Sequence, residues 1–231
     1  MDGSGNEIRI ITDEQVEELL SMRTAIELMR DAFAALSSGA ATVPVRSSVV
    51  NETTRCTLLS MPAVADEAGF VHKAVSVQPA NPDVGIPSVN GLVTVFDRQT
   101  GRPRAIMGAE ALTAIRTGAA TGLATDLLAL EGARILAVFG TGPQARTQVD
   151  AVCCVREIEH ILVYGRDQSK AASFAEAVAT RAGVPCTSTT SRNLLRDADV
   201  VCAATSSPVP VFEATDILPG CHVNGVGSYR L

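Results

Sequence analysis

A glycine-rich turn that follows a short apolar run constrains the fold of this chain more than any other feature. The run Ile135–Phe139 has the length and composition of a buried strand. Gly140, Gly142 and Ala145 follow it at the G-x-G-x-x-A spacing and open a helical segment. Here the first glycine permits a tight bend, the second lets the backbone approach a pyrophosphate, and the alanine lets helix and strand pack closely. Glycine turns also end strands for structural reasons, but the flanking strand and helix favour a dinucleotide-binding βαβ unit, whose helix N-terminus binds phosphates.

Length, charge and cysteine usage limit the class of protein. A chain of 231 residues is expected to form one large or two small domains. The net charge of -6 disfavours nucleic acid as a partner, although a local site can still bind an anionic cofactor. The six cysteines show no C-x-x-C pair and no metal-ligand spacing, so we predict no metal and a reduced, intracellular setting. Neither a signal peptide nor a membrane-length apolar run is visible, which predicts a cytoplasmic protein with no membrane partner.

The first half of the chain is predicted to be α+β. Thr12 and Gln15 have the spacing of a capping box, and apolar residues at helical spacing predict a second helix over 23–36. From 43 to 107 the pattern changes to short β segments separated by turn residues.

Three cations in this half are candidate ligand-binding residues. Arg46 and Lys73 lie within apolar β segments, and alternation alone equally allows both side chains to face solvent. The helix predicted over 109–129 is built almost wholly of small residues, and Arg116 is the only cation in it. A guanidinium in such surroundings requires an anion, which is either a ligand carboxylate or phosphate or an internal Asp or Glu.

The second half alternates strands and helices, which predicts a doubly wound parallel sheet with its ligand at the carboxyl ends of the strands. The predicted strands cover 135–139, 160–164, 186–188, 200–204 and 222–226, and the predicted helices lie near 144–154, 168–182 and 191–196.

The end of the second of these strands bears on the choice of cofactor. An NAD enzyme has an acidic residue there that accepts from the ribose 2′-hydroxyl. This chain has Arg166, with Ser169 and Lys170 close behind, and these side chains suit a 2′-phosphate. We therefore favour NADP(H), while Asp167 keeps NAD(H) open.

Several of these segments together resemble the ornithine cyclodeaminase/mu-crystallin family. They are Arg46, Lys73, the loop 81–88, the segment 112–120 with its Thr-Ala-Ile-Arg-Thr-Gly motif, and the glycine turn 140–146. The family also includes cyclic-imine (ketimine, pyrroline-2-carboxylate) reductases and an archaeal type of alanine dehydrogenase. The likeness runs from about residue 8 to the last residue.

The resemblance implies a homodimer of two-domain subunits. Residues 1–125 would form an α+β domain that binds substrate and pairs subunits, and residues 126–231 a Rossmann domain. Arg46, Lys73 and Arg116 would converge on the carboxylate of a small amino or imino acid. With the turn and Arg166 included, the expected cofactor-binding residues are Ser88, Arg116, Thr117, Gly140, Thr141, Gly142, Pro143, Gln144, Ala145, Arg166, Thr205, Val226, Gly227 and Ser228.

The last segment bears on the chemistry. Residues 222–230 resemble the family segment that closes over the nicotinamide, and in cyclodeaminases an acidic residue follows its glycine pair. Tyr229 stands in that position, which disfavours ornithine cyclodeamination and favours hydride transfer to an imine. Family members continue with a further strand and C-terminal helices, so we expect the C-terminal part of the fold to be missing.

The predicted function is therefore reduction of a (cyclic) α-imino acid, such as pyrroline-2-carboxylate, by NAD(P)H. Lys73 completes the carboxylate clamp and relays a proton to the imine nitrogen. Hydride transfer occurs between substrate and nicotinamide, and positioning supplies most of the rate gain. Two alternatives stay open: an ornithine cyclodeaminase that recycles NAD, and a non-catalytic protein that binds NADPH or a small ligand, as in mu-crystallin.

Overall fold

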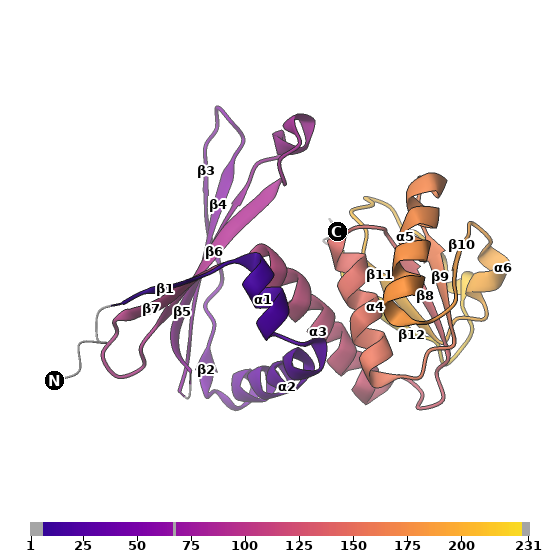
Figure 1. Ribbon diagram of the computed structural model, residues 1–231, viewed down its shortest axis with the longest axis horizontal. Coiled ribbons are helices and arrows are strands. Elements are labelled where there is room, and N and C mark those ends of the chain that lie inside the picture. The colour runs from indigo at the N-terminus through magenta and orange to yellow at the C-terminus, as the bar shows by residue number, and fades with distance from the viewer. Residues whose placement is uncertain (1–6, 67, 228–231) are drawn as a thin grey trace. The chain divides into compact units, whose positions relative to one another are not determined.

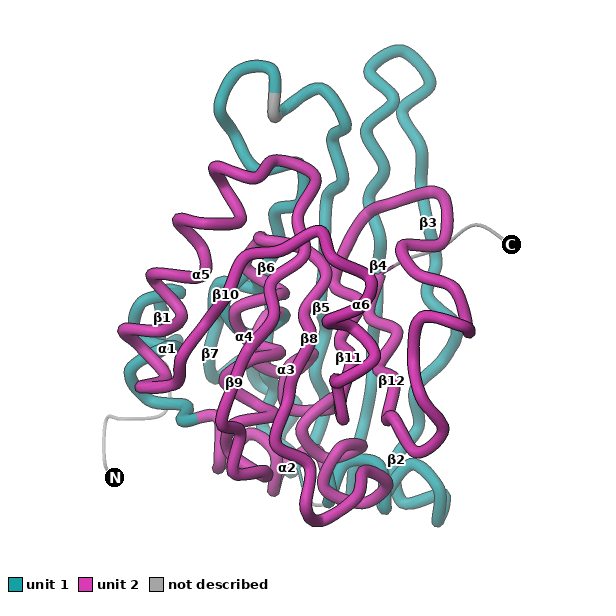
Figure 2. Tube along the Cα trace, turned by 90° about the vertical axis from the view of Figure 1, so that its right-hand side faces the viewer, with its two compact units in different colours: residues 1–21, 30–113 teal, residues 22–29, 114–231 magenta. Residues whose placement is uncertain are grey.

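The computed structural model describes residues 7–66 and 68–227, and the chain forms two compact units (Figure 2). Unit 1 comprises residues 1–21 and 30–113, and unit 2 comprises residues 22–29 and 114–231. The chain passes between the units at three points: immediately before α2 (Met22–Ser38), within α2 and within α3 (Glu110–Leu128). The domain boundary expected at 125–126 lies further along α3.

Unit 1 is built on a mixed sheet. In the described part of the chain this sheet has seven strands, with the order β1-β7-β6-β5-β4-β2 and with β3 paired to β4. All neighbours run antiparallel except β1 and β7, which are parallel. The strands are β1 (Arg9–Ile11), β2 (Ala41–Thr42), β3 (Ser47–Val50), β4 (Thr57–Ala65), β5 (Gly69–Val77), β6 (Val89–Phe96) and β7 (Pro103–Gly108).

Two helical segments of unit 1 begin with side-chain caps. Helix α1 (Asp13–Leu19) starts with the predicted capping box, in which Thr12 and Gln15 each bond the other's backbone N–H. Asp13 in turn accepts a hydrogen bond from the N–H of Ala111 at 2.8 Å, and so satisfies one of the first donors of α3. The loop after β5 contains a short 3-10 helix, η1 (Asn81–Val84).

Unit 2 contains the parallel sheet that the second half of the sequence predicts. Figure 1 labels its elements. Its described strands are ordered β10-β9-β8-β11-β12, so the strand order reverses between β8 and β11 (Figure 2). The strands are β8 (Ile135–Phe139), β9 (His160–Tyr164), β10 (Cys186–Ser188), β11 (Val200–Ala203) and β12 (His222–Gly225). The helices are α4 (Pro143–Val155), α5 (Gln168–Ala182) and α6 (Arg192–Leu195), with a 3-10 turn η2 (Ala214–Asp216).

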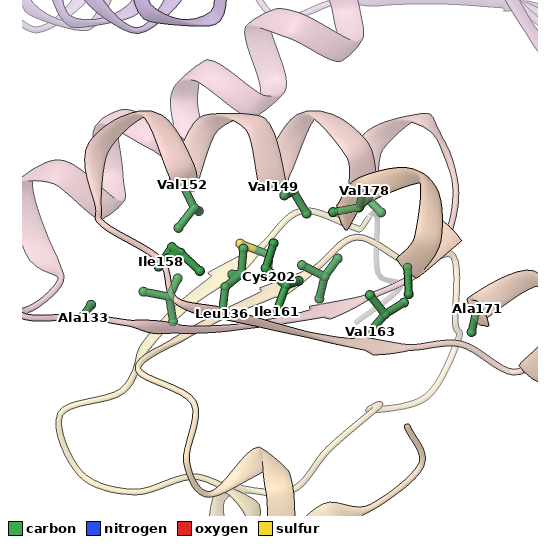
Figure 3. Packing of buried hydrophobic residues seen from close by; sticks show 14 of the residues in the cluster. Ala133, Leu136, Val149, Val152, Ile158, Ile161, Val163, Ala171, Val178 and Cys202 are labelled. Atoms are coloured by element: carbon green, nitrogen blue, oxygen red, sulfur yellow. The ribbon is translucent and has the colours of Figure 1, made fainter. Parts of the chain in front are cut away.

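Apolar side chains cover both faces of this sheet, which is why its strands read as continuous hydrophobic runs. On one face Val149 and Val152 of α4 and Val178 of α5 pack on strand residues that include Leu136 and Ile161 (Figure 3). Each such fully buried side chain contributes roughly 1.5–3 kcal/mol. On the other face the cluster includes Leu195 of α6 and, packed against it, Val211, Phe212 and Ile217. The doubly wound prediction is confirmed. None of the helices in the described ranges combines the length and hydropathy that a bilayer crossing requires.

Candidate functional site

The turn after β8 has the backbone geometry expected of a phosphate-binding loop. Gly140 has φ +113°, and a Cβ there would lie 2.2 Å from the carbonyl oxygen of Ala204, so only glycine fits. Gly142 is the N-cap of α4, and Pro143 occupies the first turn. No side chain caps this helix end, so its first N–H groups have no side-chain acceptor and are available to an anion.

Other loops meet this turn at the carboxyl edge of the sheet. A Cβ on Gly227, after β12, would lie 2.2 Å from the carbonyl oxygen of Thr205, which follows β11. A Cβ on Gly165, after β9, would lie 3.2 Å from the Cγ2 atom of Thr141. Four of the expected cofactor residues, Gly140, Thr141, Thr205 and Gly227, are thus gathered at the edge where doubly wound sheets bind ligands.

Two glycines of the turn make a matched pair of tests. In Gly140→Ala, the left-handed φ and the backbone clash should lower the melting temperature of the ligand-free protein by several degrees, since such strain costs about 1–3 kcal/mol. Gly142→Ala meets open space at φ -94°, so its ligand-free melting temperature should not change. Its methyl group instead obstructs a pyrophosphate and should weaken NADPH binding. Thermal-shift titration measures both, and equal ligand-free stability of the two variants would contradict the assigned geometry.

The loop after β9 carries the residues that bear on the choice between NAD(H) and NADP(H), and the structure gives them different surroundings. The Asp167 carboxylate caps α5 by accepting from the N–H of Lys170 at 3.1 Å. The side chains of Arg166 and Lys170 are exposed, and neither makes an ion pair with another described residue. The acidic residue therefore has a structural partner, whereas the two cations face solvent.

In unit 1, Lys73 points into the protein rather than into solvent. Its ammonium donates to the Thr113 hydroxyl at 2.5 Å, and Thr113 donates to the carbonyl of Ala109 one turn earlier in α3. Lys73 also pairs in register with Val93, which is buried. Alternation left open whether the Lys73 side chain faces solvent or the protein interior, and in the structure it faces the interior.

Arg46 is exposed and lies one residue before β3. Ser47 pairs with Ser60, and Met61 pairs with Lys73. Alternation continued back by one residue therefore assigns Arg46 to the face of the sheet that carries Lys73.

Residues on the opposite face form a cross-strand pair that sequence reasoning did not predict. His72 lies on this face, as alternation from Lys73 predicts, and its Nε2 atom is 2.7 Å from the Ser60 hydroxyl. The two residues have no acidic partner among the described side chains, so they lack the third member of a catalytic triad. His72 also lines an apolar cavity of about 480 Å³ whose walls include Pro62 and Phe70.

Arg116 fits the ligand-binding interpretation. It keeps an exposed surface on α3, and no acidic side chain of the described residues pairs with it. Partial burial lowers the pKa of its guanidinium, which nevertheless stays charged at physiological pH. Such a cation, partly desolvated and without an internal counter-ion, is suited to a ligand carboxylate. Thr117 is the next residue of the same helix and is half-buried.

The other expected cofactor residues lie in loops. The Thr205 hydroxyl accepts from the N–H of Ser207 at 3.1 Å, and the N–H groups of Val226 and Gly227 both donate to the carbonyl of Ala203. Ser88 is half-buried in unit 1, where its carbonyl accepts from Gln78. Ser228 and Tyr229 lie outside the described residues.

The structure also identifies a supporting residue that the sequence analysis missed. Arg156 follows α4, and its buried guanidinium donates to the carbonyls of Thr125, Asp126 and Ala129 at 2.8–3.1 Å. It therefore caps the C-terminal end of α3. No sequence signal distinguishes it from the other arginines, because its acceptors are backbone atoms that only the fold brings near. Thr113, by contrast, could have been identified from the sequence as a candidate site residue. It lies three residues before Arg116 in one helix, so the two residues share a face of that helix.

These features define a class of protein. A glycine turn with an uncapped helix end lies at the strand-order reversal of a parallel sheet, and the chain also has an α+β unit with an inward-pointing lysine. This combination is typical of NAD(P)-dependent oxidoreductases. The chain belongs to the ornithine cyclodeaminase/mu-crystallin family, whose sequence model matches residues 6–231.

Relatives of known function support this assignment. A Δ1-pyrroline-2-carboxylate reductase of Bacillus cereus is 35% identical over 223 residues, which cover 96% of this chain and 68% of the relative. The solved structure of the Thermococcus litoralis Δ1-pyrroline-2-carboxylate reductase, in complex with NADH and L-proline, aligns with a TM-score of 0.89 and 36% identity over 95% of this chain and 69% of that one. An archaeal alanine dehydrogenase dimer with bound NAD aligns with a TM-score of 0.87 and 31% identity over 94% of this chain and 66% of that one.

Proposed function

We propose that this protein reduces a small α-imino acid to the corresponding amino acid with NAD(P)H, and that the substrate is a cyclic imine such as pyrroline-2-carboxylate. The observation that carries the proposal is the likeness, over 95% of the chain, to a reductase that was solved with NADH and L-proline. L-Proline is the product of adding a hydride and a proton across the C=N bond of pyrroline-2-carboxylate. The reverse reaction is the dehydrogenation of an amino acid.

Three cations are proposed to bind the substrate carboxylate: Arg46, Lys73 and Arg116. The inward direction of Lys73, and the absence of an acidic partner for Arg116 among the described residues, support this role. A guanidinium binds a carboxylate through two parallel hydrogen bonds, which fixes the orientation of the acid as well as its affinity. The acid is then presented in one orientation, which is the main requirement of a hydride transfer.

Lys73 is proposed to supply the proton. Its ammonium carries three donors, and the bond to Thr113 holds it in place within unit 1. Donation to the lone pair of the imine nitrogen forms an N–H bond and leaves Lys73 neutral, and the C=N carbon becomes more electron-poor. The C=N π bond breaks when this carbon accepts hydride, and its electron pair becomes the lone pair of the product amine. The chemistry that NAD(P)H would supply when bound is the hydride, with NAD(P)⁺ as the oxidised product.

The proposed dinucleotide site is the carboxyl edge of the sheet in unit 2. The turn with Gly140, Thr141, Gly142, Pro143, Gln144 and Ala145 fits a pyrophosphate, since its helix end is uncapped, Gly140 permits the bend against the Ala204 backbone, and Gly142 leaves open space. Thr117, Thr205, Val226 and Gly227, with Ser88 from unit 1 and Ser228, are proposed to contact the rest of the cofactor. Arg116 would contact both substrate and nicotinamide.

We further propose a preference for NADPH over NADH. Asp167 is engaged as the cap of α5, whereas Arg166 and Lys170 are exposed and suited to a 2′-phosphate. Arg166→Ala should therefore raise KM for NADPH by roughly tenfold or more, which is the loss of about one charge-assisted hydrogen bond, and leave KM for NADH nearly unchanged. Steady-state kinetics with pyrroline-2-carboxylate and each cofactor measures both values. If the wild type prefers NADH and the variant affects the two cofactors alike, Asp167 is the determinant instead.

The same assay separates the proposed reaction from its alternatives. Oxidation of NADPH or NADH that depends on pyrroline-2-carboxylate is the expected result. Release of ammonia from ornithine without net cofactor turnover would identify a cyclodeaminase. Stabilisation by NADPH without turnover of any imino or amino acid would identify a binding protein.

A homodimer formed through unit 1 is part of the proposal. The sheet face that carries His72 exposes apolar side chains on three strands, Leu58, Phe70 and Leu92. Large exposed apolar patches mark interaction surfaces, and a second copy of this chain is the occupant that fits, because a relative forms a dimer. The proposed location is the cytoplasm, where the six cysteines, all free in the structure, would stay reduced.

A further inference from the structure

Helices α3 and α4 of unit 2 touch through their backbones at one point. A Cβ on Gly118 would lie 2.5 Å from the carbonyl oxygen of Thr147 and 2.9 Å from its carbonyl carbon. Backbone atoms cannot turn aside as a side chain can, so any residue larger than glycine at 118 must push the two helices apart. One turn later, a Cβ on Gly122 would meet the Cδ1 atom of Ile26 at 2.7 Å and the Ala151 Cβ at 3.2 Å. The nearest of these atoms is the far end of a flexible side chain, which can move.

The contact at Gly118 joins two segments of the proposed site. Gly118 follows Arg116 and Thr117 directly in α3. Thr147 lies two residues beyond Ala145, the last position of the glycine turn, in the first half of α4. Both partners are buried, and all these residues belong to unit 2. The distance from the guanidinium-bearing turn of α3 to the phosphate-binding turn is therefore set by one backbone contact.

A second attachment holds α3 further along. The buried Asn224 of β12 donates to the hydroxyl of Thr125, which is fully buried, at 3.1 Å. Asn224 lies two residues before Val226, so this bond joins α3 to the strand that leads into the proposed nicotinamide segment. Arg156 caps the end of the same helix. These attachments join the second half of α3 to β12 and to the residue that follows α4.

We propose that Gly118 is a positioning residue: its close contact with Thr147 places Arg116 at the distance from the phosphate-binding turn at which a bound carboxylic acid meets the nicotinamide. The inference rests on the proposed function, because it takes Arg116 as the carboxylate ligand. Glycine at 118 is a poor choice for the stability of the helix itself, since alanine favours a helix interior. Its benefit is the approach of the two backbones.

The test compares Gly118→Ala with Gly122→Ala, the same substitution one turn apart in the same helix. Gly118→Ala should raise KM for pyrroline-2-carboxylate at least tenfold and lower kcat, while the dissociation constant of NADPH alone changes less than threefold. Gly122→Ala should leave all three within twofold of the wild type, because Ile26 can move. Measurements well below each melting temperature separate positioning from stability.

A second readout requires no turnover. Calorimetric titration of L-proline into the NADP⁺ complex should show at least tenfold weaker binding for Gly118→Ala and unchanged binding for Gly122→Ala. Thr125→Val removes the hydrogen bond to Asn224 and keeps the size of the side chain. This variant is the test to use if Gly118→Ala does not fold, and it should weaken L-proline binding severalfold.

Three negative results have different meanings. If the wild type binds L-proline but reduces no imino acid, the proposed function fails and the titrations still test Gly118. If Gly118→Ala matches Gly122→Ala in every constant, or differs only in melting temperature, the positioning role is wrong. Failure of L-proline to bind the wild-type NADP⁺ complex at all overturns both.

Discussion

Replacing Arg116 with glutamine is expected to raise KM for pyrroline-2-carboxylate by roughly 100-fold or more. Loss of one partner from a partly desolvated carboxylate–guanidinium pair costs about 3–5 kcal/mol, because the remaining charge is left uncompensated. The effect should fall mainly on KM, since the carboxylate is bound alike before and during hydride transfer. Arg116→Lys should recover only part of the loss, because an ammonium cannot reproduce the two parallel hydrogen bonds. Steady-state kinetics at saturating cofactor measures these changes.

Arg104→Gln is a suitable control for the loss of a positive charge. Arg104 lies in β7 and forms an exposed ion pair with Asp97 at 3.1 Å, whose loss has little energetic consequence. Its kinetic constants should match those of the wild type. A KM for Arg116→Gln within threefold of the wild-type value would show that the substrate carboxylate is bound elsewhere.

Replacing Lys73 with methionine is expected to lower kcat/KM by about 10²–10⁴, the range that a general acid contributes. Methionine keeps the length of the side chain and loses the ammonium, so the proton donor and the bond to Thr113 disappear together. Thr113→Val, which leaves the ammonium but removes its acceptor, should cost less. Both effects should appear in single-turnover measurements at saturating cofactor, where product release does not contribute.

The chain's other lysine provides the matched control for this variant. Lys170 is exposed at the start of α5, and with NADH as the donor Lys170→Met should leave kcat/KM unchanged. Retention of the wild-type kcat by Lys73→Met would assign the proton to another donor or to water, and would leave Lys73 at most a ligand of the carboxylate.

The sequence specified unit 2 more fully than unit 1. The predicted bounds of β8, β9 and β10 are the observed ones, because parallel strands buried on both faces are continuous apolar runs between turn residues. In unit 1 the strand segment expected from residue 43 begins only at Ser47. Ladder pairing, which the sequence does not encode locally, decides where such a strand starts.

Side-chain direction was the main quantity that the sequence could not supply. Alternation separates Lys73 from His72, but only the packing of α3 decides which of them faces the interior. The acceptors of Arg156 and the backbone contact of Gly118 likewise depend on segments far apart in the chain. The NADPH preference remains a prediction, because the solved relatives named above contain NADH or NAD.

The order of strands in unit 2 has a consequence for how the protein reaches its native state. Strand β8 lies at the centre of its sheet, yet one of its neighbours is β11, which the chain supplies only after two further strands and three helices. Pairings between such distant segments form late, because the entropy of closing the intervening loop is lost before the stabilising contacts between the strands can form. The seam between β8 and β11 is also where Gly140 meets Ala204. A nucleotide added during refolding should therefore leave the early steps unchanged and trap only molecules in which this last seam has closed.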